Sequence, residues 1–156
     1  MLTHIMQSKL PDSTATDFYN FMINPPAEVY AKWLPEEHYE FHIVKHSNNS
    51  PVDDLIYFDQ NIGNKYRLKL YGIIREAHNP NRIVFQMRKF RLNLPGYLEL
   101  EFLDSPEGLL LTETLRIGFR GIGKVLDPFI RLVAKGFIKE LNEHHKREWQ
   151  NLSEIL

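Results

Sequence analysis

The stretch GKVLDPFIRLVAKGFIKELNEHHKREWQNLSEI, residues 123–155, decides the fold of this chain. Within it, Asp127 can cap a helix, and Pro128 suits the first helical position, where a missing N–H group costs nothing. Apolar residues then recur at steps of three and four, as in a helix with one buried face: Ile130, Val133, Phe137 and Leu141. The stretch therefore predicts one long C-terminal helix packed against the rest of the chain.

Ionisable residues interrupt the apolar spacing near the end of this helix. The next positions of the pattern hold His144 and Glu148 before Leu152 restores it. Residues four apart stand on one helix face, so both side chains can point at a single spot. Charged groups are seldom buried unless they are paired or bind a metal, which makes these two the first candidates for a functional site. The alternative is that His144 and Glu148 have no function. In that case the buried face of the helix runs through His145 and Trp149, and the charged residues of the last turn are simply solvated.

Length and composition favour one folded domain, residues 1–156, of ordinary globular character. The chain is 43% hydrophobic and 25% charged, with a formal net charge of −1, so no overall charge draws it to nucleic acid or an anionic membrane. It has no cysteine, which excludes disulfides, thiol catalysis and cysteine-bound zinc. The N-terminus resembles no signal peptide and no apolar run could span a bilayer, so we expect a cytoplasmic protein without a membrane partner.

The first half of the chain carries mixed signals. The β-branched and aromatic residues 16–23 predict a strand, and residues 1–12 show no strong period. Asn24 before two prolines predicts a helix start, and Pro35 ends that helix after Leu34. Residues 36–45 then predict a second short helix, on which His38 and His42 stand one turn apart.

After residue 51 the hydrophobic period changes to two, which is typical of strands. Short turn-forming segments separate these runs and predict antiparallel neighbours: Gly63-Asn64, His78 to Asn81, Pro95-Gly96 and Ser105 to Gly108. The five predicted strands are Leu55–Asn61, Tyr66–Glu76, Arg82–Leu92, Tyr97–Asp104 and Leu109–Phe119.

Alternation along these strands predicts one apolar and one charged sheet face, as expected for a sheet that wraps a helix. Leu98 and Leu100 fall on the apolar face and Glu99 on the other. Glu113 is the exception, because it shares the apolar face with Leu111 and Leu115. A carboxylate there needs a partner; the alternative is an edge strand or a bulge that brings Glu113 to water.

The order of elements and the segment INPPAEVYAKWL, residues 23–34, resemble the START-like, or birch-pollen-allergen-like, superfamily. The resemblance covers nearly the whole chain. It implies an α+β helix-grip fold, in which a curved antiparallel sheet wraps a long C-terminal helix, with two short helices after the first strand. It also implies a cavity between sheet and helix for a hydrophobic or aromatic small molecule.

Within that superfamily the chain resembles the diacetylphloroglucinol and phloretin hydrolases, which cleave a carbon–carbon bond between an aromatic ring and an acyl group. Their zinc ion is held by two histidines and two glutamates. His144 and Glu148 match the helical pair, and His38 in WLPEEH, residues 33–38, matches the other histidine. The fourth ligand is a strand glutamate, but here YFDQNIG, residues 57–63, offers Asp59 or Gln60.

The resemblance thus implies zinc, or another divalent ion, on His38, His144 and Glu148, with Asp59 as a provisional fourth ligand. Such an ion can polarise an acyl carbonyl and activate water. Glu113 and His42 are the candidates for moving protons.

Two other functions fit the same residues. A carrier would hold a lipid or hydrophobic metabolite without chemistry, its buried polar cluster orienting the ligand. A polyketide cyclase or aromatase would use cavity shape and acid–base residues without a metal. Nucleic-acid binding is not expected, because the basic run at residues 88–91 is a short solvated strand face. The sequence leaves the oligomeric state open.

Overall fold

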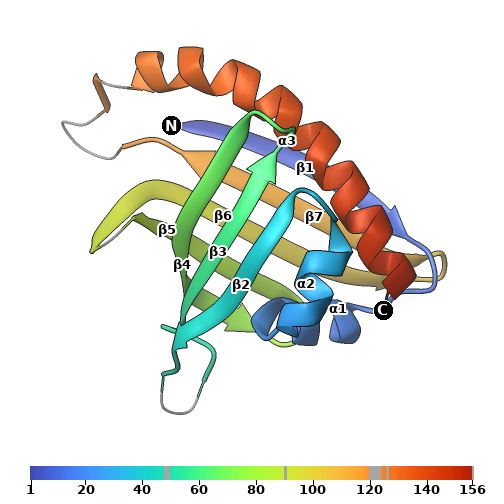
Figure 1. The fold of residues 1–156 in the computed structure, drawn as a ribbon. Helices are drawn as coiled ribbons and strands as arrows, with labels where there is room; N and C mark the ends of the chain where they lie inside the picture. The colour runs from blue at the N-terminus through green and yellow to red at the C-terminus, as the bar shows by residue number, and fades with distance from the viewer. Residues whose placement is uncertain (48–49, 90, 120–123, 126, 156) are drawn as a thin grey trace.

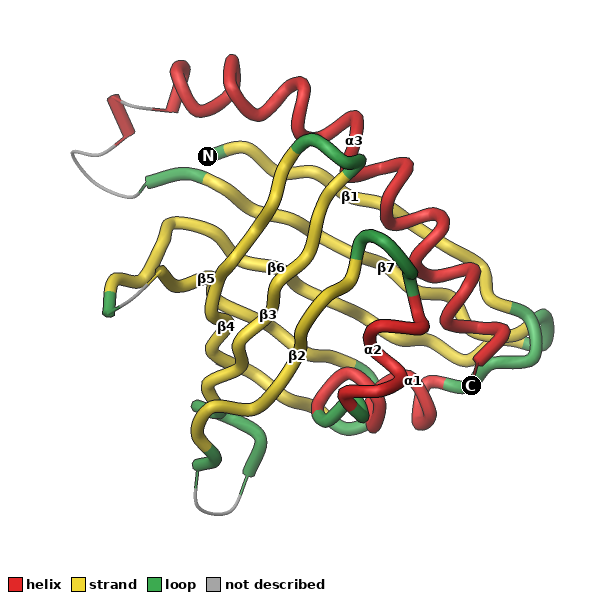
Figure 2. The backbone as a smooth tube through the Cα atoms, viewed as in Figure 1, coloured by secondary structure: helices red, strands yellow, loops and turns green. Residues whose placement is uncertain are grey.

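A curved antiparallel sheet with a long helix laid across it forms the body of the molecule (Figures 1 and 2). The computed structural model describes residues 1–47, 50–89, 91–119, 124–125 and 127–155. Its elements follow in the order β1 (Leu2–Leu10), α1 (Ala15–Ile23), α2 (Ala27–Trp33), β2 (His38–Lys45), β3 (Leu55–Ile62), β4 (Tyr66–His78), β5 (Arg82–Lys89), β6 (Leu92–Ser105), β7 (Gly108–Ile117) and α3 (Asp127–Ile155).

The strands lie in the order β1-β7-β6-β5-β4-β3-β2, so strands β2 to β7 pair with their sequence neighbours and β1 closes the far side against β7. The expected Gly63-Asn64 turn joins β3 to β4, and both residues have positive φ, of 59° and 57°. Glycine and asparagine tolerate this conformation better than other residues. The α+β helix-grip architecture predicted from the sequence is confirmed.

Alternation along the central strands separates a face toward α3 from an outer face, as predicted. Leu98 lines the internal cavity and Leu100 is fully buried. Glu99, between them, binds Arg82 and Arg116 in ion pairs of 2.6 and 2.8 Å. The outer face is therefore a set of paired charges, and the inner face is free to pack on the helices.

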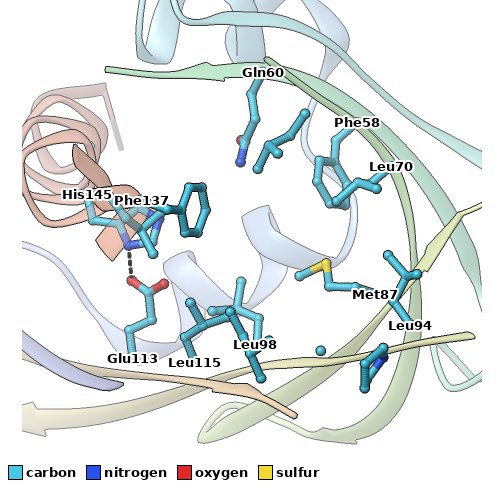
Figure 3. Close-up of a pocket in the computed structure, with 15 residues that line it drawn as sticks. Phe58, Gln60, Leu70, Met87, Leu94, Leu98, Glu113, Leu115, Phe137 and His145 are labelled. Carbon is cyan, nitrogen blue, oxygen red and sulfur yellow. Dashed lines mark ion pairs between the residues drawn. The ribbon is translucent and has the colours of Figure 1, made fainter. Parts of the chain in front are cut away.

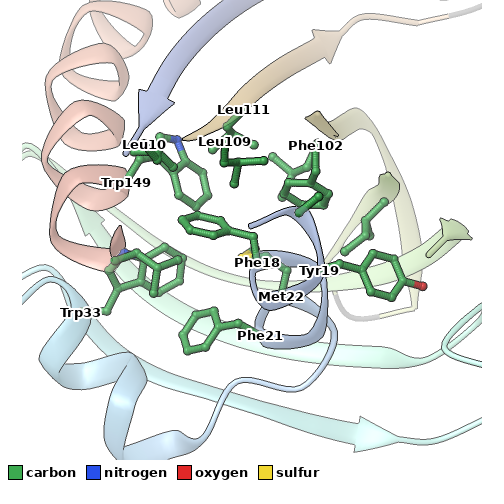
Figure 4. Packing of buried hydrophobic residues seen from close by; sticks show 14 of the residues in the cluster. Leu10, Phe18, Tyr19, Phe21, Met22, Trp33, Phe102, Leu109, Leu111 and Trp149 are labelled. Atoms are coloured by element: carbon green, nitrogen blue, oxygen red, sulfur yellow. The ribbon is translucent and has the colours of Figure 1, made fainter. Parts of the chain in front are cut away.

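The three helices cover the inner face and complete the core (Figure 4). Helix α3 crosses the sheet, and α1 and α2 lie near its C-terminal end (Figure 1). The ring of Phe18 of α1 lies 6.4 Å from the rings of both Phe102 and Trp149, in tilted contacts that join α1 to the sheet and to α3. On α3, Leu141 and Leu152 are buried and Phe137 is partly buried, as predicted. The side chains of Ile130 and Val133 lie outside the described part of the helix.

The prediction for residues 16–23 is wrong, because this segment is helix α1 and the first strand is β1. Buried residues of α1 recur at helical rather than alternating steps, at Ala15, Phe18, Tyr19 and Met22, and five of its nine residues are buried. The Thr14 side chain caps the helix by accepting from the Asp17 N–H at 3.2 Å. Strand β1 alternates in exposure but carries polar and apolar residues alike, since it is an edge strand.

The predicted helix at residues 36–45 is also wrong, because His38–Lys45 is strand β2. Register shifts between His38 and Glu40 and between Ile43 and Lys45 interrupt its pairing with β3. The first irregularity puts His38 and Phe41, three residues apart, on the buried side. An irregular strand can thus copy the spacing of a helix. The two short helices of the fold are present, but they are α1 and α2.

Two turn assignments also change. Asn24 ends α1 rather than capping α2, whose N-cap is Pro26. Pro95-Gly96 lies inside β6, at a register shift opposite the 86–88 segment of β5, and not between strands.

Candidate metal centre and ligand cavity

Three predicted ligands meet between α3 and β2. His38, His144 and Glu148 each offer an atom within 4.8 Å of the others, and all three residues are buried. Among the described residues this is the group of histidines and acids with the geometry of a metal site. The alternative of a solvated last turn is therefore excluded, since His144 is fully inaccessible and Glu148 is 6% exposed.

The spacing of the ligand atoms suits a small divalent ion. Tetrahedral zinc with bonds of about 2.0–2.1 Å holds its ligand atoms about 3.3 Å apart. His38 Nε2 lies 3.3 Å from Glu148 Oε1, and His144 Nε2 lies 3.7 Å from Glu148 Oε2. The donor set of two imidazoles and a carboxylate therefore fits zinc in both ligand type and spacing.

Glu37 fixes the tautomer of His144. Its carboxylate contacts His144 Nδ1 and accepts from Arg147 at 2.5 Å. Burial raises the pKa of Glu37, but the hydrogen bonds from His144 and Arg147 outweigh it and lower the pKa overall. An ionised carboxylate only accepts, so Nδ1 carries the proton and Nε2 presents its lone pair to the group. Carboxylate–histidine pairs of this kind are usual behind metal ligands.

Aromatic rings rather than hydrogen bonds hold His38. Tyr30 stacks on its ring at 4.4 Å and 8°, and Trp33 packs edge-on at 4.9 Å. Neither ring nitrogen of His38 has a hydrogen bond among the described residues, and His144 Nε2 has none. Buried polar atoms without partners are costly, and a metal ion would satisfy one nitrogen of His38 together with Nε2 of His144.

The protonation states also suit a cation. Burial raises the pKa of Glu148, but contact with His38 and the charges of His144 and His145 lower it to about 2. Burial, together with the charges of His145 and His38, lowers the pKa of His144 overall, although Glu148 and Glu37 raise it. Ionised glutamate and neutral imidazole are the forms that bind metals.

An apolar cavity of about 280 Å³ lies beside this group, between α3 and the inner face of the sheet (Figure 3). Its wall includes Phe58, Leu70, Met87 and Leu98. A smaller lobe of about 90 Å³ shares Phe58 and Met87 with it and reaches Glu148. The candidate metal ligand Glu148 thus faces the deeper part of the space.

Glu113 points into the larger cavity from β7, opposite Gln60 (Figure 3). It is 1% exposed, and His145 Nδ1 and Trp149 Nε1 lie 2.8 and 3.2 Å from its Oε2. The alternative of an edge or bulged strand is excluded, because β7 lies between β1 and β6 without a register shift. Burial lowers the pKa of His145, but the charge of Glu113 and contact with it raise the pKa overall.

Asp59 does not join the metal group. Its carboxylate is bound by Arg67 at 2.9 Å and Lys69 at 3.4 Å. The hydrogen bond from Arg67 is the main reason that the pKa of Asp59 is lowered. The neighbouring Gln60 faces the cavity instead, pairs with His38 across the strands, and accepts from Tyr30 Oη at 3.1 Å.

His42 lies away from the site as well. Its side chain is 48% exposed, forms an ion pair with Glu40 and packs against Tyr57. The expected helical step from His38 does not exist, because the segment is a strand. The predicted seam through His145 and Trp149 is buried as well, since His145 is 7% and Trp149 4% exposed. No functional role was predicted for His145 or for Glu37, although they adjoin His144 and His38.

Comparison with known proteins supports the fold and leaves the chemistry open. No protein-family model matches the chain, and no curated protein matches its sequence. Ginseng major latex-like protein 151 from Panax ginseng superposes with a TM-score of 0.60 at 12% identity, over 92% of this chain and 97% of that one. A START superfamily protein from Mycobacterium smegmatis gives 0.57 at 13% identity, over 91% of each chain.

A third similar structure is the di-domain ARO/CYC BexL from the BE-7585A biosynthetic pathway, with a TM-score of 0.62 at 14% identity. The match covers 98% of this chain and 49% of BexL. Identities this low establish a shared fold. Separately, none of the described helices has the length and apolar character needed to cross a bilayer.

Proposed function

We propose that this protein binds a small hydrophobic or aromatic molecule in the cavity and acts on it with a divalent metal, zinc by preference. The observation that carries the proposal is the group of buried nitrogens without hydrogen bonds, the two of His38 and Nε2 of His144, beside the carboxylate of Glu148. A buried cluster of this kind is more costly without a cation than with one.

The reaction we propose is hydrolysis of an acyl-substituted aromatic compound, in which water adds across the bond from ring to carbonyl carbon. The products are the unsubstituted ring and a carboxylic acid. The resemblance to the diacetylphloroglucinol and phloretin hydrolases, carried by His38, His144 and Glu148, supports this choice. When bound, a zinc ion supplies Lewis-acid polarisation of a carbonyl.

The residues of the chain would position the substrate and handle the protons. The apolar wall around Phe58 and Met87 would hold the ring and exclude water. Glu113, buried beside the cavity with His145, is the group placed to accept or return a proton. His42 is too far outside the site for this role, and its exposed ion pair with Glu40 gives it another partner.

A carrier without chemistry is the second candidate, and Gln60 favours it. An amide, and not a carboxylate, faces the lobe beside His38, so the chain offers three ionisable ligands where the hydrolases have four. On this reading His144, Glu148 and Glu113 form a polar cluster that orients a bound molecule.

Metal content of the purified protein separates the two candidates. We expect near-stoichiometric zinc in the wild type, its loss in His144→Ala and in His38→Ala, and its retention in the control His42→Ala. Added zinc should raise the unfolding temperature of the wild type and of the control only. Absence of bound metal, with unfolding unchanged by zinc or by chelator, would exclude the metal-dependent enzyme and leave the carrier. With metal bound, acid release from acylated phenols tests the reaction.

A further inference from the structure

Glu113 and His145 form a second polar group, on the other side of α3 from the Glu37–His144 contact. Glu113 stands on β7 and contacts the helix through His145 and Trp149. Both Glu113 and His145 line the cavity of about 280 Å³, whereas His38 and His144 do not (Figure 3). Any molecule in the larger cavity therefore meets this pair directly.

The two carboxylate oxygens of Glu113 differ in their hydrogen-bond partners. Oε2 is the oxygen in contact with both His145 and Trp149. Oε1 is buried and has no hydrogen-bond partner among the described residues. An unpartnered carboxyl oxygen at an apolar wall is costly, and a donor from a bound molecule would satisfy it.

The charged side chains around the cavity determine which chemical class of molecule can supply that hydrogen-bond donor. No lysine or arginine is among its described lining residues, and its polar side chains are Gln60, Glu113 and His145. The two ring nitrogens of His145 already face carboxylates, Nδ1 at 2.8 Å from Glu113 and Nε2 at 3.6 Å from Glu148. An acid headgroup in this cavity would meet the Glu113 carboxylate with no lysine or arginine among the described lining residues, and like charges in a low-dielectric space repel strongly.

The size of the cavity further limits the class of molecule that it can bind. Ligand pockets commonly span roughly 300–1,000 Å³, and this cavity, at about 280 Å³ with a lobe of about 90 Å³, lies at the lower end. One ring system fits such a space better than a two-chain lipid or an extended polycyclic chain.

We infer that Glu113 Oε1 is a hydroxyl-recognition site, and that the cavity selects small neutral ring compounds bearing a hydroxyl or N–H donor over carboxylic acids of the same shape. The inference rests on the proposed binding of a small molecule in this cavity. It does not require a metal. Gln60, on the opposite wall, offers a second polar contact across the cavity.

Three probes that share one ring system test this selection: 2-naphthol, 2-methoxynaphthalene and 2-naphthoate, titrated into the full chain by calorimetry or naphthol fluorescence. We expect 2-naphthol to bind about tenfold more tightly than 2-methoxynaphthalene, as for one hydrogen bond to a charged group, and 2-naphthoate to bind most weakly. Glu113→Gln should cut the preference for naphthol over its methyl ether to about threefold or less. The control Glu99→Gln removes a buried carboxylate on the outer face of the sheet and should leave the preference unchanged.

The possible results test the hydroxyl-recognition site separately from the proposed binding of a small molecule. Equal binding of naphthol and its methyl ether by the wild type, or tighter binding of naphthoate, would overturn the hydroxyl site and leave small-molecule binding intact. Failure of all three probes to bind would overturn both. If Glu113→Gln does not fold, His145→Gln provides the second variant. This variant keeps Glu113 and should therefore retain the preference for naphthol over its methyl ether. Loss of that preference in His145→Gln would contradict a site centred on Oε1.

Discussion

Neighbouring residues of one helix serve two different polar groups in this molecule. His144 turns toward β2, where its Nδ1 contacts Glu37 and its Nε2 joins His38 and Glu148 without a hydrogen bond. His145 turns toward β7 and meets Glu113 directly at 2.8 Å. The first group leaves ligand atoms open toward a common point. The second is a closed pair in that Glu113 contacts both His145 and Trp149, although His145 Nε2 also lies 3.6 Å from Glu148 of the first group. Oε1 of Glu113 has no hydrogen-bond partner among the described residues.

A metal site differs from a buried ion pair in that its ligand atoms converge on one point without binding one another. In the group around His144, a carboxylate behind the ring leaves the other nitrogen free, and aromatic rings instead of polar atoms hold His38. In the pair around His145, the imidazole lies 2.8 Å from the Glu113 carboxylate as an ion pair, and the same carboxylate oxygen accepts from Trp149 Nε1. Burial alone does not distinguish the two, because Glu113 and His144 are both almost wholly inaccessible.

Breaking the closed pair should have the largest effect on stability. Glu113→Leu leaves the buried His145 and the Trp149 N–H group without their shared acceptor, and removal of one partner from a buried pair costs about 3–5 kcal/mol. Urea unfolding at neutral pH measures this. Removal of both partners, in Glu113→Leu with His145→Leu, should recover part of the loss. A single variant within about 0.5 kcal/mol of the wild type, the range of ordinary surface changes, would show that the pair is not formed.

Loosening the open group should act on metal affinity more than on folding. Glu37→Gln removes the carboxylate that fixes the Nδ1–H tautomer of His144, and loss of such a contact costs about 10–100-fold in metal affinity. Competition with a zinc indicator measures the change. The matched control is Glu143→Gln on the same helix, because Glu143 is 66% exposed and pairs with Lys146 at 3.9 Å. Equal affinities for the two variants would remove Glu37 from the site.

Substitution of Asp59 tests whether its carboxylate stabilises the fold or binds the metal. Asp59→Asn should keep the zinc content of the wild type and lower the unfolding temperature at pH 7 by about 2–4 °C, the shift that a loss of about 1 kcal/mol gives in a chain of this size. The Arg67 hydrogen bond lowers the pKa of Asp59 in the folded state. Its stabilisation is therefore present above the unfolded pKa of about 3.9 and is lost as the pH falls through the lower folded value.

The check on Asp59 is a pair of thermal unfolding curves at pH 7 and near pH 3, with metal analysis of both proteins. The gap between wild type and variant should narrow at the lower pH. A loss of bound zinc in Asp59→Asn would show that Asp59 is a metal ligand.

His42→Asn should have the smallest effect of the series. The side chain is about half exposed and touches neither polar group, so the free energy of unfolding should change by no more than about 0.5 kcal/mol. Zinc affinity and naphthol binding should match the wild type. A tenfold change in either would mean that β2 is placed differently from the strand seen here.

Local pattern was enough to predict much of this protein. The helical step along α3 and the alternation along parts of β6 and β7 repeat over many residues, so their buried faces follow from the sequence. Along β5 the burial does not alternate, because Val84 and Gln86 are buried as well as Ile83 and Phe85. The same periods put Glu113 and the His144–Glu148 pair inside, and both are buried. The resemblance supplied His38 as their companion, and the three candidate ligands do meet.

Tertiary structure decided what no local period encodes. The irregular pairing of β2 gave His38 and Phe41 a helix-like spacing in a strand. Strand register turned Gln60 inward and left Asp59 to Arg67, because a shift of one residue exchanges the two faces of a sheet. Glu37 reaches His144 across 107 residues. The sequence determines which residues lie inside through its periods, whereas the contacts among them depend on register and packing between elements far apart in the chain.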